Sequence, residues 1–560
     1  MRFPTWRVFL FAISLCAASL PSPAHGAESS VGNPTSDADK TQQVSRGKLV
    51  YLQHCVICHQ STGQGSPGTF PPLAKSDFLL KERRRSILAL VQGLSEPITV
   101  NGQRYHGAMP PVVLDDQKAA DVLTYARNSF GNAADAITPD EVKQVRAKSR
   151  FPTYELLVKA AAYPPLPKAP AGFTLREVVR LTEHGTRLAW DATGRSLYVL
   201  GNRGEVWRVE TGTGKTTSIL RGEDYFDRKL GDPSTVGFTF GAQRRLYIVV
   251  DQRADKGPLI TNNVTIFRTT KTENGEPAKP EPWFRTSYPW GIGPFNHGVG
   301  HVAIGPDGFV YVSSGSRTDG NEAGSDDRFF KGGEVPTTAC LWRLDPSSAN
   351  PQIEIYAAGL RNAYGFCWTD KGEMFATDNG PDADAPEELN LIERGKHYGF
   401  PFQFADWSTK PYPYTPDAPD RLAFARPIPN LGPAAGGNET KPIYSFDPHS
   451  SPAGIAFLGG EFPAEHRGTL LVTRFGNLLK KPADAGYDLL QVRLQRDSEG
   501  KYRARMTTFL APLGRPLDVV VGPKGRIYVL EYTRQTDNKA EFGMLPGRIL
   551  ELAVKAQTGG

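Results

Sequence analysis

The chain has 560 residues, of which 39% are hydrophobic and 22% are charged, and it carries a formal net charge of +6. So small a charge over this length excludes the dense basic surface on which nucleic-acid binding depends. After the N-terminal segment the sequence has no long apolar run, so we expect a soluble mature protein without a membrane span.

Residues 1–26 have the pattern of a cleaved secretory signal. Arg2 and Arg7 precede a mostly apolar run at 8–20, and small residues lead up to a cleavage site before Ala27. The run is too short to cross a bilayer. Removing this segment removes two arginines and no acid, so the net charge falls from +6 to +4. We therefore expect a periplasmic or secreted protein.

The sequence Cys-Val-Ile-Cys-His at residues 55–59 is typical of covalent haem attachment. Its spacing lets Cys55 and Cys58 reach the two vinyl groups of one porphyrin, and His59 then stands where its imidazole can ligate the iron. Zinc binding or thiol redox chemistry is the alternative. Zinc would need two further ligands nearby, and His106 is the only obvious one.

Met109 is the predicted second axial ligand of the iron. It lies fifty residues after His59, in a loop that Pro110 and Pro111 hold extended, and the chain has only five Met. Ligation of iron by His and Met favours electron transfer, because it raises the potential and leaves no open site for oxygen.

Two helices are predicted around this motif, at residues 41–54 and 115–129. Gly47 in the first helix would let Tyr125 of the second cross it closely. Together with the haem motif and the Met-Pro loop, these helices make residues 41–132 resemble a class I cytochrome c domain. The resemblance implies a small all-α domain that carries one covalent haem c.

Residues 133–169 are predicted to link two unlike parts. Thr138 and Glu141 form a capping box around Pro139, which opens a short charged helix. Four prolines between residues 164 and 170 then make a stiff connection.

Residues 170–555 repeat one unit of short strands separated by Gly, Pro, Asn and Asp. Six copies can be aligned, at 188–209, 236–268, 299–344, 364–392, 453–493 and 518–552. One such unit cannot bury both faces of its sheet, whereas six closed in a ring can. We therefore predict an all-β six-bladed β-propeller. An open β-sandwich array would not explain the regular unit.

Cys340 and Cys367 both lie in apolar strand segments of this repeat. We predict two buried thiols, although an oxidising compartment would also permit a disulfide between them.

Three loops of the repeat carry more reactive side chains than turns require. They occupy residues 296–301, 359–362 and 378–382, and the third is followed by polar residues at 387–390 and 396–399. Because these loops lead adjacent units, we expect them to meet at one end of the central channel.

Residues 186–553 resemble the soluble PQQ-dependent glucose and sorbosone dehydrogenases, which are six-bladed propellers. The match is most specific at residues 356–401, and the segment Asn296-His297-Gly298-Val299-Gly300-His301 matches the loop that bears the family's catalytic His. Residues 400–450 depart freely from the family, and the specificity loops are expected there.

Several positions that contact the cofactor also depart from the family. Leu517 replaces the second of two paired basic residues, of which Arg515 matches the first. His301 stands where an Arg commonly follows the catalytic loop. A Lys expected near residues 472–476 is absent, and Arg474 is the candidate substitute.

The residue types fit the chemistry that the resemblance implies. A neutral imidazole is a suitable base for a hydroxyl proton, so His297 is the predicted base. A cation beside the quinone oxygen stabilises developing charge, which fits Arg361. The predicted PQQ contacts are Arg361, Asn362, Asn379, Arg474 and Arg515, with Arg474 and Arg515 as clamps for its carboxylates.

The resemblance also implies calcium. The carbonyls of Gly380 and Pro381 would hold the ion bound to PQQ, and Glu388 and Tyr398 would belong to a second site. The acidic run 382–388 could instead be a solvated loop.

These features predict a periplasmic quinohaemoprotein. A sugar or a related alcohol or aldehyde would be oxidised by hydride transfer to PQQ, and electrons would pass singly to haem c and on to a downstream cytochrome or terminal oxidase. One alternative is a haem c electron-transfer protein whose propeller only binds a ligand or partner. Another is a calcium-dependent lactone hydrolase, which leaves the haem unexplained.

Overall fold

The structure, a computed structural model, describes residues 37–555 with short gaps. The gaps are residues 66–69, 95, 106–108, 192, 256, 270–271, 274–275, 292–296, 323–326, 406–409, 411, 441–444, 478–484 and 537–544. The predicted signal segment and His106 therefore lie outside the described residues. Within the described residues, no helix is both long enough and apolar enough to cross a membrane.

The N-terminal part is helical, as predicted. Its helices are α1 (Asp37–His54), α2 (Val56–His59), α3 (Asp77–Lys81), α4 (Arg83–Gln92) and α5 (Asp116–Arg127), with a small hairpin of β1 (Ile98–Val100) and β2 (Gln103–Tyr105). Two short helices, α6 (Pro139–Arg146) and α7 (Tyr154–Ala160), lead to the second part. The helices predicted at 41–54 and 115–129 are confirmed as α1 and α5.

Helices α1 and α5 cross at a glycine, as the sequence predicts. A Cβ atom on Gly47 would lie 2.0 Å from the carbonyl oxygen of Asp121 and 2.7 Å from the Cβ of Tyr125, so no larger residue fits. The Arg46 guanidinium pairs with the Asp121 carboxylate at 2.8 Å beside the crossing. Tyr51 and Tyr125 pack with ring centroids 5.3 Å apart. The capping box of Thr138 and Glu141 is also present, at the start of α6.

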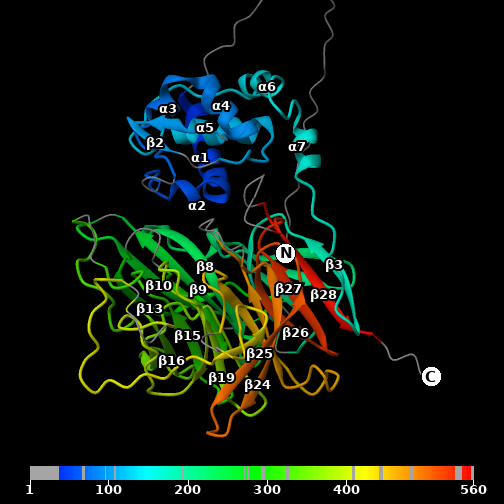
Figure 1. Cartoon of the computed structure of the whole chain (residues 1–560). Helices are drawn as coiled ribbons and strands as arrows, with labels where there is room; N and C mark the ends of the chain where they lie inside the picture. Colours follow the sequence, from blue (N-terminus) through cyan, green and yellow to red (C-terminus); the bar gives the residue numbers. More distant parts are fainter. Residues whose placement is uncertain are drawn as a thin grey trace, which may run out of the picture.

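The second part is a ring of six sheets, which confirms the six-bladed propeller (Figure 1). The sheets are β4–β7; β8, β9, β10 and β13; β14–β17; β18–β20; β22–β25 with β21; and β26–β28 with β3. The first strands of neighbouring blades contact one another in the order β4, β8, β14, β18, β22, β26 and back to β4. In the described residues, one buried apolar cluster fills each of the six spaces between neighbouring blades.

The strand bounds follow the predicted units closely. They are β3 (Phe173–Arg180), β4 (Gly185–Trp190), β5 (Leu197–Gly201), β6 (Val206–Glu210), β7 (Lys215–Leu220), β8 (Asp232–Phe240), β9 (Leu246–Ala254), β10 (Thr261–Arg268), β11 (Thr272–Glu273), β12 (Glu276–Pro277), β13 (Glu281–Pro289), β14 (Val299–Ile304), β15 (Val310–Ser314), β16 (Cys340–Leu344), β17 (Glu354–Ala358), β18 (Gly365–Trp368), β19 (Met374–Asp378), β20 (Glu388–Ile392), β21 (Asn430–Pro433), β22 (Pro452–Leu458), β23 (Thr469–Arg474), β24 (Asp488–Arg496), β25 (Tyr502–Leu510), β26 (Pro516–Gly522), β27 (Arg526–Glu531) and β28 (Arg548–Val554). Short 3-10 helices are η1 (Gly222–Asp224), η2 (Arg228–Leu230) and η3 (Ala242–Arg244).

The last blade is completed by the first strand of the propeller. Strand β3 pairs antiparallel with β28, with Phe173 opposite Val554 and Arg180 opposite Arg548. The sequence analysis found the three inner strands of each unit but missed β3 and the outer strands β7, β13, β17 and β25. Closure between the two ends of the chain therefore comes from the tertiary structure.

The connection between the two parts is anchored to this last blade. The Tyr163 hydroxyl lies 2.9 Å and 3.0 Å from the carbonyl oxygens of Pro546 and Gly547. The guanidinium groups of Arg534 and Arg180 lie 4.1 Å and 4.8 Å from the centre of the Tyr163 ring. Figure 1 shows the helical part held above one end of the propeller, with α2 nearest to it.

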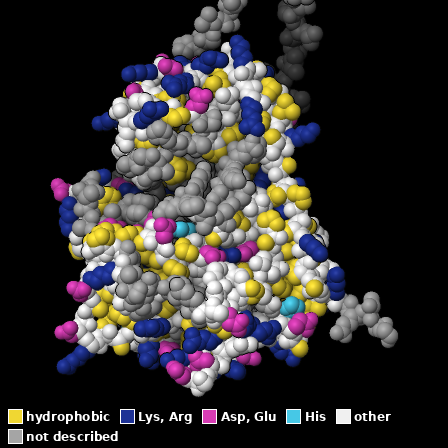
Figure 2. Space-filling model, viewed as in Figure 1, with side chains coloured by type: hydrophobic (Ala, Val, Ile, Leu, Met, Phe, Trp, Pro, Cys, Tyr) yellow, Lys and Arg dark blue, Asp and Glu magenta, His cyan; other side chains and the backbone are white. Residues whose placement is uncertain are grey.

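The visible surface carries acidic and basic side chains interspersed over both parts (Figure 2). This agrees with the small net charge of the chain.

The closure strand provides a test of the ring. Phe173 is buried and packs edge-to-face on Phe509 at 5.2 Å. We expect Phe173→Ala to lower the free energy of unfolding of the propeller by about 3–5 kcal/mol, because it leaves a cavity in the closing sheet. Seven of the eight tryptophans lie at or beyond residue 190, and the eighth is Trp6, so tryptophan fluorescence in urea follows the propeller. The exposed neighbour Thr174→Ala is the control and should change stability by no more than about 0.5 kcal/mol.

Candidate functional site

The helical part contains an apolar cavity of about 130 Å³. Cys55, Cys58, His59 and Met109 all line it, so the structure brings together the four residues predicted for haem attachment and ligation. The remaining walls are largely apolar and include Tyr51, Phe70, Leu79, Leu90, Leu94, Val122 and Leu123.

His59 is oriented by the loop that follows it. Its Nδ1 lies 3.0 Å from the carbonyl oxygen of Pro71. A carbonyl only accepts, so Nδ1 carries the proton and the Nε2 lone pair remains for a metal. Burial lowers the pKa of His59, which keeps the ring neutral as ligation requires.

Cys55 and Cys58 have the environment of attachment thiols and not of redox thiols. Burial, and to a smaller extent Cys58, raises the pKa of Cys55 to about 12, whereas a reactive redox cysteine has a lowered pKa. Among the residues that the structure describes, no group of three or more His, Cys, Asp and Glu is placed to hold a metal ion. His106, the further ligand that zinc would need, lies outside the described residues, and the raised pKa of Cys55 argues against thiol redox chemistry.

The Met109 loop is pinned to the end of α4. The backbones of Met109 and Leu94 exchange two hydrogen bonds, of 2.8 Å and 2.7 Å. Gly93 makes this possible, since a Cβ at its left-handed conformation would lie 2.5 Å from the Met109 carbonyl oxygen.

The ligand assignment can be tested by replacing Met109. We expect Met109→Ala to keep covalent haem, because the thioethers come from Cys55 and Cys58, and to lose the weak long-wavelength absorption band of methionine-ligated ferric haem. The reduction potential should fall. Met506→Leu, a change in the propeller core, is the control and should leave the spectrum as in the wild type. A Met109→Ala protein that keeps the band would show that another residue is the ligand.

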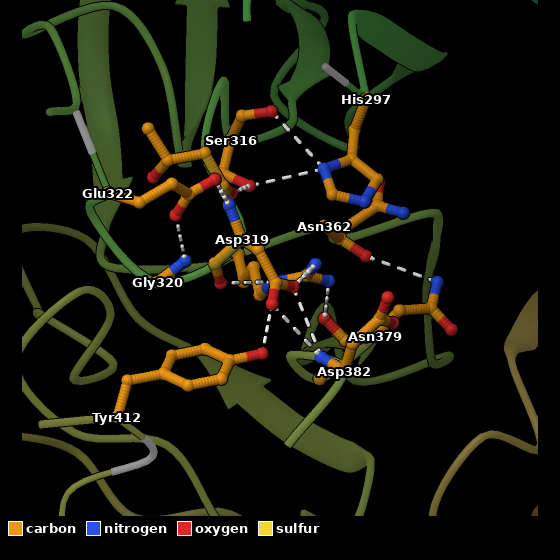
Figure 3. A network of polar contacts seen from close by, with 12 residues as sticks. His297, Ser316, Asp319, Gly320, Glu322, Asn362, Asn379, Asp382 and Tyr412 are labelled. Atoms are coloured by element: carbon orange, nitrogen blue, oxygen red, sulfur yellow. Dashed lines mark hydrogen bonds and ion pairs between the residues drawn. The ribbon is translucent and has the colours of Figure 1, made fainter. Parts of the chain in front are cut away.

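The propeller brings four of its predicted site residues together at the end of the ring where the first strands begin (Figure 3). His297 precedes β14, Arg361 and Asn362 precede β18, and Asn379 follows β19. Backbone hydrogen bonds join these loops across blades: the His297 amide donates to the Ser316 carbonyl at 3.0 Å, and the Ser316 amide donates to the Arg361 carbonyl at 2.6 Å. The Asn379 amide donates to the Asn362 carbonyl at 3.1 Å.

His297 is held as a neutral base. Its Nδ1 lies 3.1 Å from both the carbonyl oxygen and the Oγ of Ser316, so Nδ1 is protonated and Nε2 is the basic atom. Burial, followed by the charge of Arg361, lowers the pKa of His297 to about 3. A Cβ on Gly315 would lie 2.5 Å from the His297 Cβ, so this glycine lets the loop pass close to the ring.

Arg361 is fixed by a carboxylate that the sequence analysis did not identify. Its Nη2 lies 2.5 Å from Asp319 Oδ1, its Nε donates to the Asp319 carbonyl at 3.0 Å, and its Nη1 donates to the Asn379 carbonyl at 3.0 Å. Asp319 also accepts hydrogen bonds from the Tyr412 hydroxyl and, at 3.1 Å, from the Asp382 amide. Asp319 therefore joins three loops around the buried guanidinium.

The residues that were missed had only a weak signal in the sequence. Ser316 and Asp319 belong to a polar run at residues 315–320, which follows β15 at the same end as the predicted loops. Tyr412 lies in the region that departs from the family pattern, 93 residues from Asp319 along the chain. Spacing could not have paired it with the site.

Buried carboxylates hold the Gly380 loop. The Asp378 carboxylate accepts from the amides of Arg361 at 3.0 Å and Asn362 at 2.5 Å. Glu387 accepts from the Gly380 amide, and burial raises the pKa of Glu387 to about 7. Burial likewise raises the pKa of Glu388 to about 7. The Asp378 and Glu387 carboxylates therefore hold the backbone amides of Arg361, Asn362 and Gly380 in place.

The predicted calcium ligands divide into two sets. Among the described residues, neither the Gly380 nor the Pro381 carbonyl accepts a hydrogen bond, so both oxygens are available to a cation. Glu388 and Tyr398 are not brought together: Glu388 begins β20, whereas the Tyr398 hydroxyl donates to the Leu391 carbonyl near its other end, at 2.7 Å.

The two predicted carboxylate clamps differ in their surroundings. Arg474 is ion-paired with Asp488 and with Asp447, both at 2.7 Å, so its charge is balanced within the protein. Arg515 lies between the rings of Phe475 and Tyr487, 5.1 Å from the centre of each.

Leu517 is buried, and His301 lines the central channel, a cavity of about 300 Å³ that also contains an Arg187–Asp518 pair at 3.3 Å.

Cys340 and Cys367 are free thiols, so the prediction that they do not pair is confirmed; Cys340 is buried and Cys367 only half-buried.

The sequence models of two known families match these two parts. That of the glucose/sorbosone dehydrogenases matches residues 198–539, which is more than half of the chain, and that of cytochrome c matches residues 44–129. Fold and site thus define a redox protein in which a cytochrome c precedes a β-propeller. The chain belongs to the glucose/sorbosone dehydrogenase family and carries an N-terminal cytochrome c domain, which implies haem.

Relatives are similar to one part or the other. Cytochrome c-552 of Thermus thermophilus is 40% identical over 116 residues, which are 19% of this chain and 88% of that protein. Quinoprotein glucose dehydrogenase B of Acinetobacter calcoaceticus is 26% identical over 132 residues, 19% of this chain and 26% of that protein. The PQQ-bound aldose sugar dehydrogenase of Streptomyces coelicolor is 20% identical with a TM-score of 0.46, over 69% of this chain and 100% of that one.

The Asp319–Arg361 pair provides a test of how the site is built. We expect Asp319→Ala to cost about 3–5 kcal/mol of propeller stability, because it leaves the Arg361 guanidinium buried without its carboxylate. The control is Glu354→Ala, which removes a partly exposed partner of Arg343 at 2.9 Å and should cost about 0–1 kcal/mol. Urea unfolding followed by tryptophan fluorescence measures both. Equal losses in the two variants would contradict the assignment.

Proposed function

We propose that this protein is a quinohaemoprotein dehydrogenase. It oxidises a sugar, or a related alcohol or aldehyde, by hydride transfer to PQQ, and its own haem c takes the electrons one at a time. Membership of the glucose/sorbosone dehydrogenase family and the fused cytochrome c domain support this proposal. A haem on the same chain is a tethered one-electron acceptor at high effective concentration.

One observation carries the proposal: the haem-bearing segment lies over the same end of the propeller as His297 and Arg361. Gln53, two residues before Cys55, donates a hydrogen bond of 2.8 Å to Glu183, just before β4. His297 stands in the corresponding position, just before β14. Because the first strands of the blades begin at one end of the ring, the two sites share that end (Figure 1).

The residues of this end fit PQQ. The side-chain oxygen of Asn379 is buried and has no hydrogen-bond partner among the described residues, as expected of a group that awaits a ligand. Arg361 and Arg515 supply positive charge for the carbonyl and carboxylate groups of the cofactor. When bound, PQQ supplies an electrophilic quinone carbonyl that accepts a hydride. Arg474, Asn362 and Asn379 complete the proposed contacts.

The chain itself supplies the proton chemistry. Nε2 of His297 takes the proton of the substrate hydroxyl, since Nδ1 is occupied by its bond to Ser316. Arg361, fixed by Asp319, provides a positive charge that needs no reorganisation during the reaction.

Calcium is the second proposed cofactor. The free carbonyls of Gly380 and Pro381 would hold an ion that acts as a Lewis acid beside the quinone. Glu388, at the start of β20, stays a predicted ligand of a second ion, which Tyr398 near the other end of the strand would not share. We place the mature protein in the periplasm, after removal of residues 1–26, where it would pass electrons to a downstream cytochrome or terminal oxidase.

The proposal is tested with the haem-loaded full-length protein, with Ca²⁺ and PQQ added and a panel of aldoses, alcohols and aldehydes. We expect the ferrous haem spectrum to appear after substrate is added, and to be absent without PQQ and in His297→Ala. The control Lys501→Ala removes an exposed ion pair with Glu499 and should reduce its haem normally. No haem reduction with any substrate, despite bound PQQ, would favour a propeller that only binds a ligand or partner.

The pH dependence of the reaction reports on His297. The base acts when neutral and its pKa is lowered, so activity is lost as the pH falls through that pKa, and the acid limb of kcat/KM should lie well below pH 6.5. Ser316→Asp places a carboxylate beside Nδ1, which raises the pKa of His297 and moves the limb to higher pH. Ser316→Ala keeps the carbonyl bond and should leave the limb in place. A limb that is unchanged in Ser316→Asp would contradict the role of His297.

A further inference from the structure

We propose that the end of α1 and the segment 182–184 form the electron-transfer interface of this protein, in which His54, His184 and Tyr532 bridge the haem attachment segment and the Arg515 end of the propeller site. The inference rests on the proposed function and adds the residues that position its two halves.

The interface is a direct contact between the two domains. Besides the bond from Gln53 to Glu183, the Arg203 Nη2 donates to the Leu49 carbonyl of α1 at 3.3 Å. Glu183 precedes β4 and Arg203 follows β5, so both belong to the site end of the first blade. The cytochrome c domain therefore meets the rim of the propeller, beside the channel, through the last turns of the helix that leads to Cys55.

His54 lies close enough to His184 across this contact for His184 to lower its pKa. His54 is bonded through its peptide to Cys55, the first predicted haem attachment residue. Burial and then the proximity of His184 lower the pKa of His54 to about 4, so the ring is neutral and part of the packed interface. His184 is buried at the start of β4.

Contacts between aromatic rings continue from His184 towards the propeller site. The rings of His184 and Tyr532 stack with centroids 4.4 Å apart and planes 24° apart, and His184 Nδ1 lies 3.0 Å from the Tyr532 carbonyl. Tyr532 in turn lies 5.8 Å from Phe475, on which Arg515 packs. The Tyr532 amide also donates to the Arg515 carbonyl at 3.0 Å. These contacts lead from His184 through Tyr532 to Arg515.

This arrangement suits single-electron transfer, because electron tunnelling falls steeply with distance and is faster through packed atoms than through water. The donor is the two-electron-reduced acceptor of the proposed function, and the recipient is ferric haem, which becomes ferrous. The second electron follows once an external one-electron acceptor has reoxidised the haem. No bond forms or breaks in the bridge residues.

The linker is fixed to the propeller close to this interface. Tyr163 is fixed on the last blade by Arg534 and Arg180, and Arg548 Nη1 donates to the Pro164 carbonyl at 3.0 Å. Tyr532 follows β27 of that same blade. Tyr163 and Tyr532 are therefore both held by the last blade, which fixes the position of the linker relative to the interface.

The test breaks the contact from the cytochrome side, far from the substrate. Gln53→Glu places a negative charge against Glu183, whereas the matched control Gln53→Lys places a positive charge there. At pH 8, we expect Gln53→Glu to slow reduction of the haem in the first turnover about tenfold, because like charges in contact disfavour docking. The rate at which a small dye is reduced directly by the propeller site, without the haem, should not change. Gln53→Lys should match the wild type.

A second readout needs neither PQQ nor substrate. Hydrogen exchange of the haem-loaded protein should be faster at residues 182–184 and 202–204 in Gln53→Glu than in Gln53→Lys or the wild type. His184→Leu removes the stacked imidazole and should slow haem reduction while leaving dye reduction intact. Unchanged exchange and unchanged haem reduction in Gln53→Glu would overturn the inference. If the wild type never reduces its haem, the proposed function fails, and the exchange experiment still decides whether this interface exists.

Discussion

The pairing of β3 with β28 is the constraint on which the rest of the structure depends. Without it, the last blade would lack its outer strand and present the unpaired edge of β28 to solvent. The closing strand comes directly after the linker, so the same pairing that seals the ring also fixes where the N-terminal domain leaves it. The strand that closes the ring is thus also the strand that follows the linker of the cytochrome c domain.

Within the closed ring, the site is organised by the need to balance buried charge. Arg361 is buried, and Asp319 pairs with it while also binding Tyr412 from a distant loop. His297 stays neutral because burial and Arg361 both disfavour its charged form. The predicted base His297, the Arg361 cation and the shape of the surrounding loops therefore depend on one another. A substitution at Asp319 is expected to affect all three.

Local patterns in the sequence were sufficient for the haem site and for most of the propeller. Cys55, Cys58, His59 and Met109 belong to short motifs with a spacing that is typical of haem attachment and ligation. The inner strands of the propeller recur with a regular turn. The outer strands were missed because they are partly exposed and separated by loops of irregular length. Asp319 was missed because its role depends on Arg361, 42 residues away.

The sequence by itself determined the haem motif and the six β-units, predicted Met109 as an iron ligand, and showed that His297 and Arg361 lead adjacent units. Only the tertiary structure decided that β3 closes the ring, that Asp319 holds Arg361, that Arg474 is neutralised by Asp447 and Asp488, and that α1 contacts the first blade. The reason is physical. Motifs and turns are set by neighbours along the chain, whereas charge balance, closure and docking arise from residues that meet only after folding.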